Sequence, residues 1–330
     1  MIRGTQWCVP FLLKGDDTIK KLIPLIVSLV FIVSLLSSCE TTKPTEGNKL
    51  SIVSTIFPYY DFAREIAGDK CELSMLIPPG SESHDYEPSP KDIININNSD
   101  IFIYNGGESD AWVDKILSSI DNDVKIIKMI DYVSPICIHS KESEHIHNSH
   151  EDHHNEVDEH IWTSPVNAIA LTKVISQEIQ SLDSNNAEFY QNNTDNYVGK
   201  LKNLHFDFSN LVNKSNKKSL VIADRFPLIY FTSEYNLEYI SAFSGCSSDT
   251  QPSIKTVKSL IDYTENNNIS VVYHMDFSNE NLAKLISEDT DSKVYTLYSC
   301  HNITKEQFED GVTYYSLMEL NLKSLKEALN

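Results

Sequence analysis

The sequence predicts an α/β protein with two lobes, each a mainly parallel sheet flanked by helices. Its 330 residues are enough for two domains, and short β-branched runs alternate with helical spacing in both halves, which is typical of βαβ units. A long polar segment at 187–212 carries apolar residues at helical spacing and is predicted to connect the halves. We expect an N-terminal lobe at 50–183, a connecting helix at 184–214 and a C-terminal lobe at 215–330.

The residues before Leu50 are predicted to lie outside the fold. Two lysines precede the apolar run Leu22–Leu36, which ends in Leu36-Ser37-Ser38-Cys39 and so resembles a bacterial lipobox. The run is shorter than the roughly 20 residues that span a bilayer. We therefore expect a signal peptide at 1–39, with an upstream extension, lipidation of Cys39, and a polar tether at 40–49. The mature protein would be held at the extracytoplasmic face of the membrane.

The first lobe is predicted to hold four strands and the helices between them. Ser89 suits an N-cap and Pro90 the first helical position, so a helix is expected to begin there. A later helix is expected to begin at Ser164-Pro165. The strands are predicted at Leu50–Ile56, Cys71–Ile77, Ile101–Tyr104 and Val124–Ile130, and the other helices at Tyr60–Ala67, Trp112–Ile120 and Val166–Leu182.

The second lobe is predicted to repeat this alternation of strands and helices. Four more β-branched runs alternate with helical segments, and a helix ends the chain. The strands are predicted at Ser219–Ala223, Glu238–Phe243, Ile269–Tyr273 and Lys293–Leu297, and the helices at Leu228–Glu234, Ser253–Asn266, Asn279–Glu288 and Gly311–Leu329.

A histidine-rich loop at 139–160 is the most unusual stretch. It holds seven of the chain's eleven histidines, interleaved with seven carboxylates, and these are the usual ligands of cations such as Zn²⁺. Too few apolar residues accompany them for a packed core. The loop either collects metal weakly at several sites or is a solvated loop with no role. The weak ligands would be His139, His145, His147, His150, His153 and His154, whereas His160 stands where an ordered pattern resumes.

Potential metal ligands follow several predicted strands. Ligands of open parallel sheets bind beyond the carboxyl ends of strands, so these residues are expected to share one rim. His84 follows the second strand, and the loop after the fourth ends at His160. In the second lobe the corresponding residues are Asp224, Cys246, His274 with Asp276, and Cys300-His301.

Composition and cysteine content narrow the function further. A net charge of −20 argues against nucleic acid, whose binding requires Lys and Arg to neutralise phosphates. We find neither a His-Glu-x-x-His nor a Gly-x-Ser-x-Gly motif, which argues against a secreted zinc hydrolase. An exported compartment permits disulfides, and Cys71–Cys137 and Cys246–Cys300 are possible pairs.

With these residues in view, the chain resembles the zinc/manganese substrate-binding lipoproteins of bacterial ABC transporters. The matching segments are Ser54–Pro58, Gly80–Pro88, His160–Pro165, Gln251–Ser253 and Tyr314–Leu329. The resemblance implies two α/β lobes joined by one rigid helix, metal in the cleft between them, and His84 and His160 as ligands. It also implies an ABC permease as partner, a monomer, and a protein that is not an enzyme. The acidic histidine-rich loop is similar to that of the zinc-selective members.

The second lobe departs from the family pattern. A histidine that the family places after the first strand of this lobe is absent here, where the segment reads Ala223-Asp224-Arg225-Phe226-Pro227. We expect His301 to restore the lost imidazole and Asp224 to supply a carboxylate. An imidazole-rich site favours Zn²⁺ over Mn²⁺, which prefers oxygen ligands. The alternatives are a manganese-specific member, an adhesin-type surface lipoprotein and, further off, a secreted zinc hydrolase.

Overall fold

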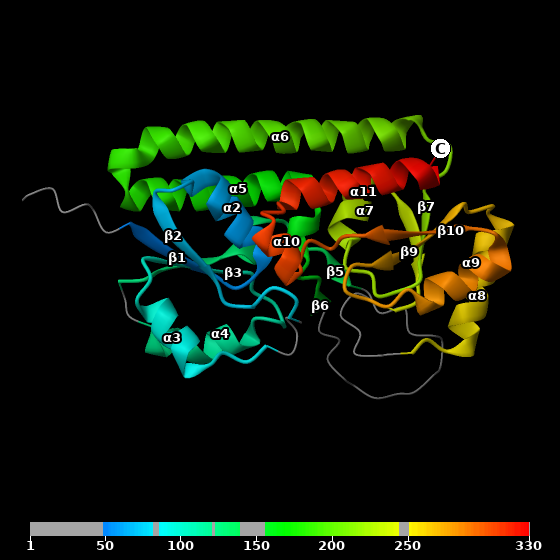
Figure 1. Ribbon diagram of the computed structural model, residues 1–330, viewed down its shortest axis with the longest axis horizontal. Helices are drawn as coiled ribbons and strands as arrows, with labels where there is room; N and C mark the ends of the chain where they lie inside the picture. The colour runs from blue at the N-terminus through cyan, green and yellow to red at the C-terminus, as the bar shows by residue number, and fades with distance from the viewer. Residues whose placement is uncertain (1–48, 82–85, 121–122, 139–155, 244–250, 330) are drawn as a thin grey trace, which may run out of the picture. The chain divides into compact units, whose positions relative to one another are not determined.

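A computed structural model of the chain describes residues 49–81, 86–120, 123–138, 156–243 and 251–329 (Figure 1). The first half of this part of the chain forms a parallel sheet in the order β2-β1-β3-β4. Ile52 of β1 lies opposite Leu73 of β2 on one side and Ile101 of β3 on the other. The strands are β1 (Leu50–Ser54), β2 (Cys71–Met75), β3 (Ile101–Tyr104) and β4 (Lys125–Lys128).

The second half repeats the arrangement in the order β10-β9-β7-β8, again with every described pairing parallel. Its strands are β7 (Ser219–Ile222), β8 (Glu238–Ser241), β9 (Val271–Met275) and β10 (Lys293–Leu297). The predicted α/β class with two parallel sheets is confirmed. Strand β9 is shifted by two residues from the predicted range Ile269–Tyr273. It ends at Met275 and therefore contains His274.

Helices flank both sheets, and most begin where the sequence predicts. Ser89 caps α3 in a reciprocal capping box with Asp92, and Ser164 caps α5 by accepting from two backbone N–H groups. The helices are α2 (Phe57–Ala67), α3 (Pro90–Asn97), α4 (Ala111–Ile116), α5 (Pro165–Leu182), α6 (Ala187–Lys214), α7 (Ile229–Tyr235), α8 (Ile254–Asn266), α9 (Asn281–Thr290), α10 (Lys305–Glu309) and α11 (Tyr314–Leu329).

Two short features were not predicted. Helix α10 begins at Thr304, which forms a capping box with Gln307. A two-stranded antiparallel pair, β5 (Cys137–Ile138) with β6 (Glu156–Val157), closes the base of the histidine-rich loop. The short 3₁₀ turns are η1 (Leu117–Ser119), η2 (Met129–Tyr132), η3 (Ile161–Thr163) and η4 (Ser184–Asn186).

The long helix α6 runs past both sheets, with α5 and α11 beside it (Figure 1). Its buried residues recur at helical spacing, among them Tyr190, Tyr197, Leu201 and Phe208. They belong to one core cluster that also takes in residues of both sheets. The two halves therefore share a hydrophobic core. Among the described residues, none of the helices combines the length and apolar character needed to cross a membrane.

The described cysteines, Cys71, Cys137 and Cys300, are all free thiols. The expected Cys71–Cys137 pair is therefore wrong. Cys71 starts β2 at the amino end of the first sheet, where its Sγ lies 3.7 Å from Tyr190 Oη, whereas Cys137 follows the carboxyl end of β4. Cys300 is fully buried, and its expected partner, Cys246, lies outside the described residues.

Candidate metal site

The structure describes three of the four ligands predicted for the tight site. His160, His301 and Asp224 lie within the described part of the chain, whereas His84 does not. The residues of the other sequence-based predictions that also lie outside it are Cys39, Cys246, His139, His145, His147, His150, His153 and His154.

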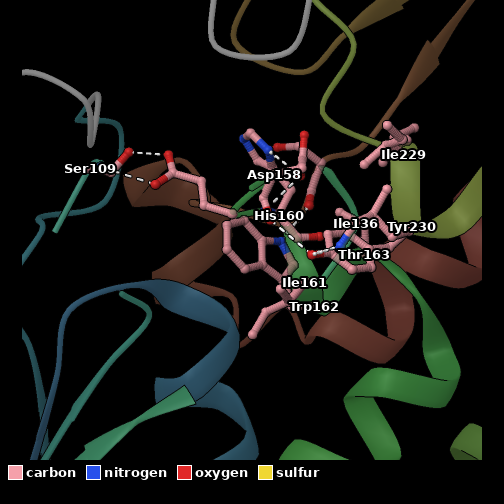
Figure 2. A network of polar contacts seen from close by, with 12 residues as sticks. Ser109, Ile136, Asp158, His160, Ile161, Trp162, Thr163, Ile229 and Tyr230 are labelled. Atoms are coloured by element: carbon pink, nitrogen blue, oxygen red, sulfur yellow. Dashed lines mark hydrogen bonds and ion pairs between the residues drawn. The ribbon is translucent and has the colours of Figure 1, made fainter. Parts of the chain in front are cut away.

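His160 is buried and firmly oriented (Figure 2). Its Nδ1 lies 3.1 Å from Asp158 Oδ1, and the same oxygen accepts from the His160 backbone N–H at 2.8 Å. Asp158 is itself fixed, because Tyr230 Oη donates to its carbonyl at 2.9 Å. A carboxylate on one ring nitrogen is the usual partner of a metal-binding histidine, since it sets the tautomer and presents Nε2 to the ion.

The neighbouring residue, Glu159, anchors this segment to the turn that follows β3. Its Oε2 accepts from Ser109 N at 3.0 Å, its Oε1 accepts from Ser109 Oγ, and its carbonyl accepts from Asn105 Nδ2 at 2.9 Å. Gly107 lies in this turn with φ of +97°, and a Cβ there would be 2.7 Å from Glu159 Oε2. The turn therefore requires glycine at this position both for its conformation and for space.

A second buried carboxylate, Asp110, lies in the same turn. Its Oδ2 accepts from the backbone N–H groups of Asn105 at 2.7 Å and Gly106 at 3.1 Å. Burial, together with the nearby charge of Glu159, raises its pKa to about 6 against the lowering effect of these two hydrogen bonds. Two acids buried next to the His160 segment make the region favourable for a cation.

His301 follows β10 and meets His160 from the other half of the chain. The centres of the two imidazole rings are 6.1 Å apart, and the Trp162 ring lies 4.9 Å from that of His301. A zinc ion lies about 2 Å from a bound histidine nitrogen, and therefore about 3 Å from the ring centre. The two rings are close enough to bind one ion together. A small pocket adjoins His301, lined by Ile56, Asn105, Ser109, Asp110, Glu159, Trp162 and His301.

Asp224 is not among the residues that line this pocket. Its Oδ1 accepts from Arg225 N at 2.8 Å and its Oδ2 from Met275 N at 3.0 Å, so it links the ends of β7 and β9. In the part of the chain that the structure describes, no group of three or more His, Cys, Asp and Glu side chains is arranged to hold a metal ion. Of the four predicted ligands, the structure thus shows His160 and His301 next to each other.

The remaining histidines of the second half and the connecting helix have structural contacts. His274 is buried in β9, with Nδ1 3.0 Å from the Met275 carbonyl and Nε2 2.9 Å from Thr296 Oγ1. The Nδ1 atom of His205, on α6, lies 3.1 Å from Tyr235 Oη. Sequence reasoning did not find the roles of Asp158, Glu159 and Asp110, because they depend on contacts between loops that are distant along the chain. The Asn-Gly-Gly sequence after β3 was the one available signal of that turn.

Two parallel sheets with a shared core, and two imidazoles meeting beyond their strands, define a two-lobe metal-binding protein. The chain matches the profile of the ZnuA family, described as zinc-uptake complex component A periplasmic, over residues 52–328. It belongs to this family. The family consists of metal-binding solute-binding proteins rather than enzymes, in agreement with the expectation from sequence.

Relatives and solved structures agree with this assignment. The chain is 32% identical to the zinc-binding lipoprotein AdcA of Streptococcus pneumoniae over 93% of its own length, but spans only 61% of that relative. It is also 32% identical to the high-affinity zinc uptake system protein ZnuA of Bacillus subtilis, covering 89% of this chain and 92% of that protein.

Among solved structures, the Zn(II)-bound ZnuA-like domain of S. pneumoniae AdcA is 30% identical with a TM-score of 0.70. The match covers 85% of this chain and 99% of that one. The metal-dependent lipoprotein YcdH of B. subtilis is 29% identical with a TM-score of 0.72, covering 86% and 100%. These neighbours share the two-lobe fold.

Proposed function

We propose that this protein captures Zn²⁺ outside the cytoplasmic membrane and delivers it to an ABC permease for import. The observation that carries the proposal is the meeting of His160 and His301, which come from the two halves of the chain with ring centres 6.1 Å apart. The names of the AdcA and ZnuA relatives, and the Zn(II)-bound state of the AdcA domain, support zinc as the ion.

The tight site consists of His84, His160 and His301, with Asp224 as the fourth ligand. Three imidazoles and one carboxylate suit tetrahedral Zn²⁺ better than Mn²⁺, which prefers more oxygen ligands. Asp224 already accepts two backbone hydrogen bonds, but a carboxylate has about four lone-pair sites and can accept a metal in addition.

A lipid on Cys39 holds the protein near its permease, and residues 40–49 are the polar tether between the lipid and the folded part. The histidine-rich loop collects zinc weakly beside the tight site. The β5–β6 pair supports this arrangement, because it fixes the loop's base within four residues of His160.

The test begins with metal analysis of protein purified without chelators or affinity tags, which should find one tightly bound zinc per chain. Competition against a zinc chelator then compares His301→Ala with His274→Ala, the matched control. A four-ligand zinc site is worth roughly 10–16 kcal/mol, so one ligand contributes on the order of 3 kcal/mol. His301→Ala should therefore bind zinc about 100-fold more weakly, and His274→Ala should bind like the parent.

Two outcomes would overturn the proposal. If His301→Ala binds as tightly as the parent while His274→Ala loses binding, the second-half ligand is misassigned. If the purified protein holds Mn²⁺ and prefers it in competition, the ion is misassigned. Unfolding curves of both variants, recorded without metal, separate ligand loss from a general loss of stability.

A further inference from the structure

The indole of Trp162 contacts both imidazoles that meet at the candidate site (Figure 2). Its ring centre is 5.5 Å from that of His160 and 4.9 Å from that of His301. Tyr59 packs on the indole edge-on, with ring centres 6.3 Å apart. The side chain is only 1% exposed. Three neighbouring rings therefore fix the orientation of this indole.

Trp162 is also hydrogen-bonded to two parts of the second half. Its Nε1 donates to the Ser299 carbonyl at 2.9 Å, two residues before His301. Its own carbonyl accepts from Tyr314 Oη, at the start of α11, at 2.8 Å. One residue of the first half therefore contacts the His301 ring and the backbone that carries it.

The backbone at 299–301 forms a tight turn after β10. Ser299 N donates to Asp276 Oδ1 at 2.8 Å, and His301 N donates to Ser299 Oγ at 3.3 Å. Cys300 between them has a φ of +58°, in the left-handed region. The second half thus shapes the turn, and the Trp162 bond to the Ser299 carbonyl holds it against the first half.

The ring contact between Trp162 and His301 should strengthen when His301 binds a metal. With a tilt of 35° between their planes, the two rings are closer to stacking than to an edge-on contact. A metal-bound imidazole gives electron density to the ion and so carries part of its positive charge. The indole face is negative, and among aromatic side chains it attracts a cation within about 6 Å most strongly. The contact therefore favours the metal-bound state.

We infer that Trp162 is a positioning residue for His301, which it fixes through the Ser299 carbonyl and whose metal-bound form it stabilises through its ring. A ligand that is already restrained near its bound position loses less freedom when the metal arrives, so the complex is tighter. This inference rests on the proposed function, in which His301 binds zinc.

Trp162→Phe tests this role. Phenylalanine keeps an aromatic ring but lacks the Nε1–H donor and attracts cations less strongly. We expect zinc affinity to fall about 10-fold, the lower end of the range for residues that support metal ligands, with the loss mainly in the dissociation rate. Chelator competition measures the affinity, and stopped-flow transfer of zinc to a fluorescent chelator measures the rate. An unchanged affinity would overturn the inference.

A double-mutant cycle with His301→Ala identifies the path of the effect. If Trp162 acts through His301, then Trp162→Phe should weaken zinc binding in the parent but not in the His301→Ala protein. An equal loss in both backgrounds would refute the positioning role and leave the proposed site intact. If His301→Ala itself binds zinc like the parent, the proposed ligand set fails instead.

Tyr273→Phe is the matched control. Tyr273 of β9 is also a fully buried aromatic residue whose side chain donates to a backbone carbonyl, that of Ser324 at 3.1 Å. Both of these residues belong to the second half, and neither lines the pocket beside His301. The variant should bind zinc like the parent. A similar loss of zinc affinity in Tyr273→Phe and Trp162→Phe would reduce the effect to general destabilisation.

Tryptophan fluorescence tests the ring contact in the unaltered protein, so the result does not depend on how a variant folds. Indole emission responds to the charge of a neighbouring imidazole, and zinc should therefore change the emission of Trp162. The change should be lost in Trp162→Phe and kept in Trp112→Phe, because Trp112 belongs to another core cluster and packs on Tyr86. A parent protein whose emission does not respond to bound zinc would contradict the inference.

Discussion

In the proposed site, the contact between Asp158 and Nδ1 of His160 leaves the other ring nitrogen, Nε2, for the metal. Asp158→Asn keeps an oxygen for the His160 backbone N–H but removes the charge that makes the ring a stronger ligand. We expect zinc affinity to fall about 10–100-fold, as measured by chelator competition.

The control for this change is Asp100→Asn. Asp100 Oδ2 also accepts a backbone N–H, that of Ser51 at 2.7 Å, and Asp100 precedes β3 rather than following a strand. Its variant should bind zinc like the parent. Equal affinities for the two variants would show that Asp158 has no special influence on His160.

Gly107 offers a test of the turn that holds Glu159. With φ of +97° and a virtual Cβ 2.7 Å from Glu159 Oε2, Gly107→Ala is expected to destabilise the fold by about 1–3 kcal/mol. Gly199, in the middle of α6, has open space around its Cβ position, so Gly199→Ala should stabilise by up to about 1 kcal/mol. Denaturant unfolding of the metal-free proteins measures both, and effects of the same sign would contradict this account.

Single residues were predictable from sequence where they followed a recognisable strand. His160 stands where an ordered pattern resumes after the fourth strand and its loop, His301 follows the last β-branched run, and the structure brings their rings together. Glu159 and Asp110 were not predictable, because their roles arise from the contact between the turn after β3 and the segment before η3. Periodicity describes one element at a time and carries no information on such contacts.

At the scale of elements, sequence patterns located the strands and helices with small shifts. Strands β3 and β10 have the predicted ends, since both are apolar runs bounded by polar residues. Helix α10 was missed because five residues are too few to establish a period. The β5–β6 pair was missed for a similar reason, as its two strands have two residues each and are far apart in sequence.

The β5–β6 pair also defines a clean deletion of the histidine-rich loop. Ile138 lies opposite Glu156, so residues 139–155 can be replaced by an Asn-Gly turn between two antiparallel strands. We expect the variant to keep one tight zinc site and to lose the weak ones, because a tract with too few apolar residues to pack loses entropy when it binds metal. Calorimetric titration with zinc distinguishes the two kinds of site. Loss of the tight site would place a required ligand within the deleted loop.

At the scale of the whole molecule, the predicted anchor determines where the protein works. Cys39→Ala should prevent lipidation, so the protein should appear in the soluble fraction or remain as an uncleaved precursor. Fractionation of cells and the mass of the mature chain measure this outcome, with Cys71→Ala as the control that retains the lipobox cysteine. A Cys39→Ala protein of unchanged mass that stays with the membrane would contradict the anchor.

The contacts of the last helix, α11, determine when the core of the first half can be completed during synthesis. Asp61 of α2 accepts the backbone N–H of Tyr314, the first residue of α11, across 253 positions of sequence. Tyr314 Oη also donates to the Trp162 carbonyl at 2.8 Å. The N-terminal core is therefore incomplete until the ribosome has synthesised nearly the whole polypeptide, and contacts so distant in sequence form slowly. If the chain is exported, as its predicted signal peptide implies, then a first half whose core is still incomplete suits passage through a secretion channel before folding ends.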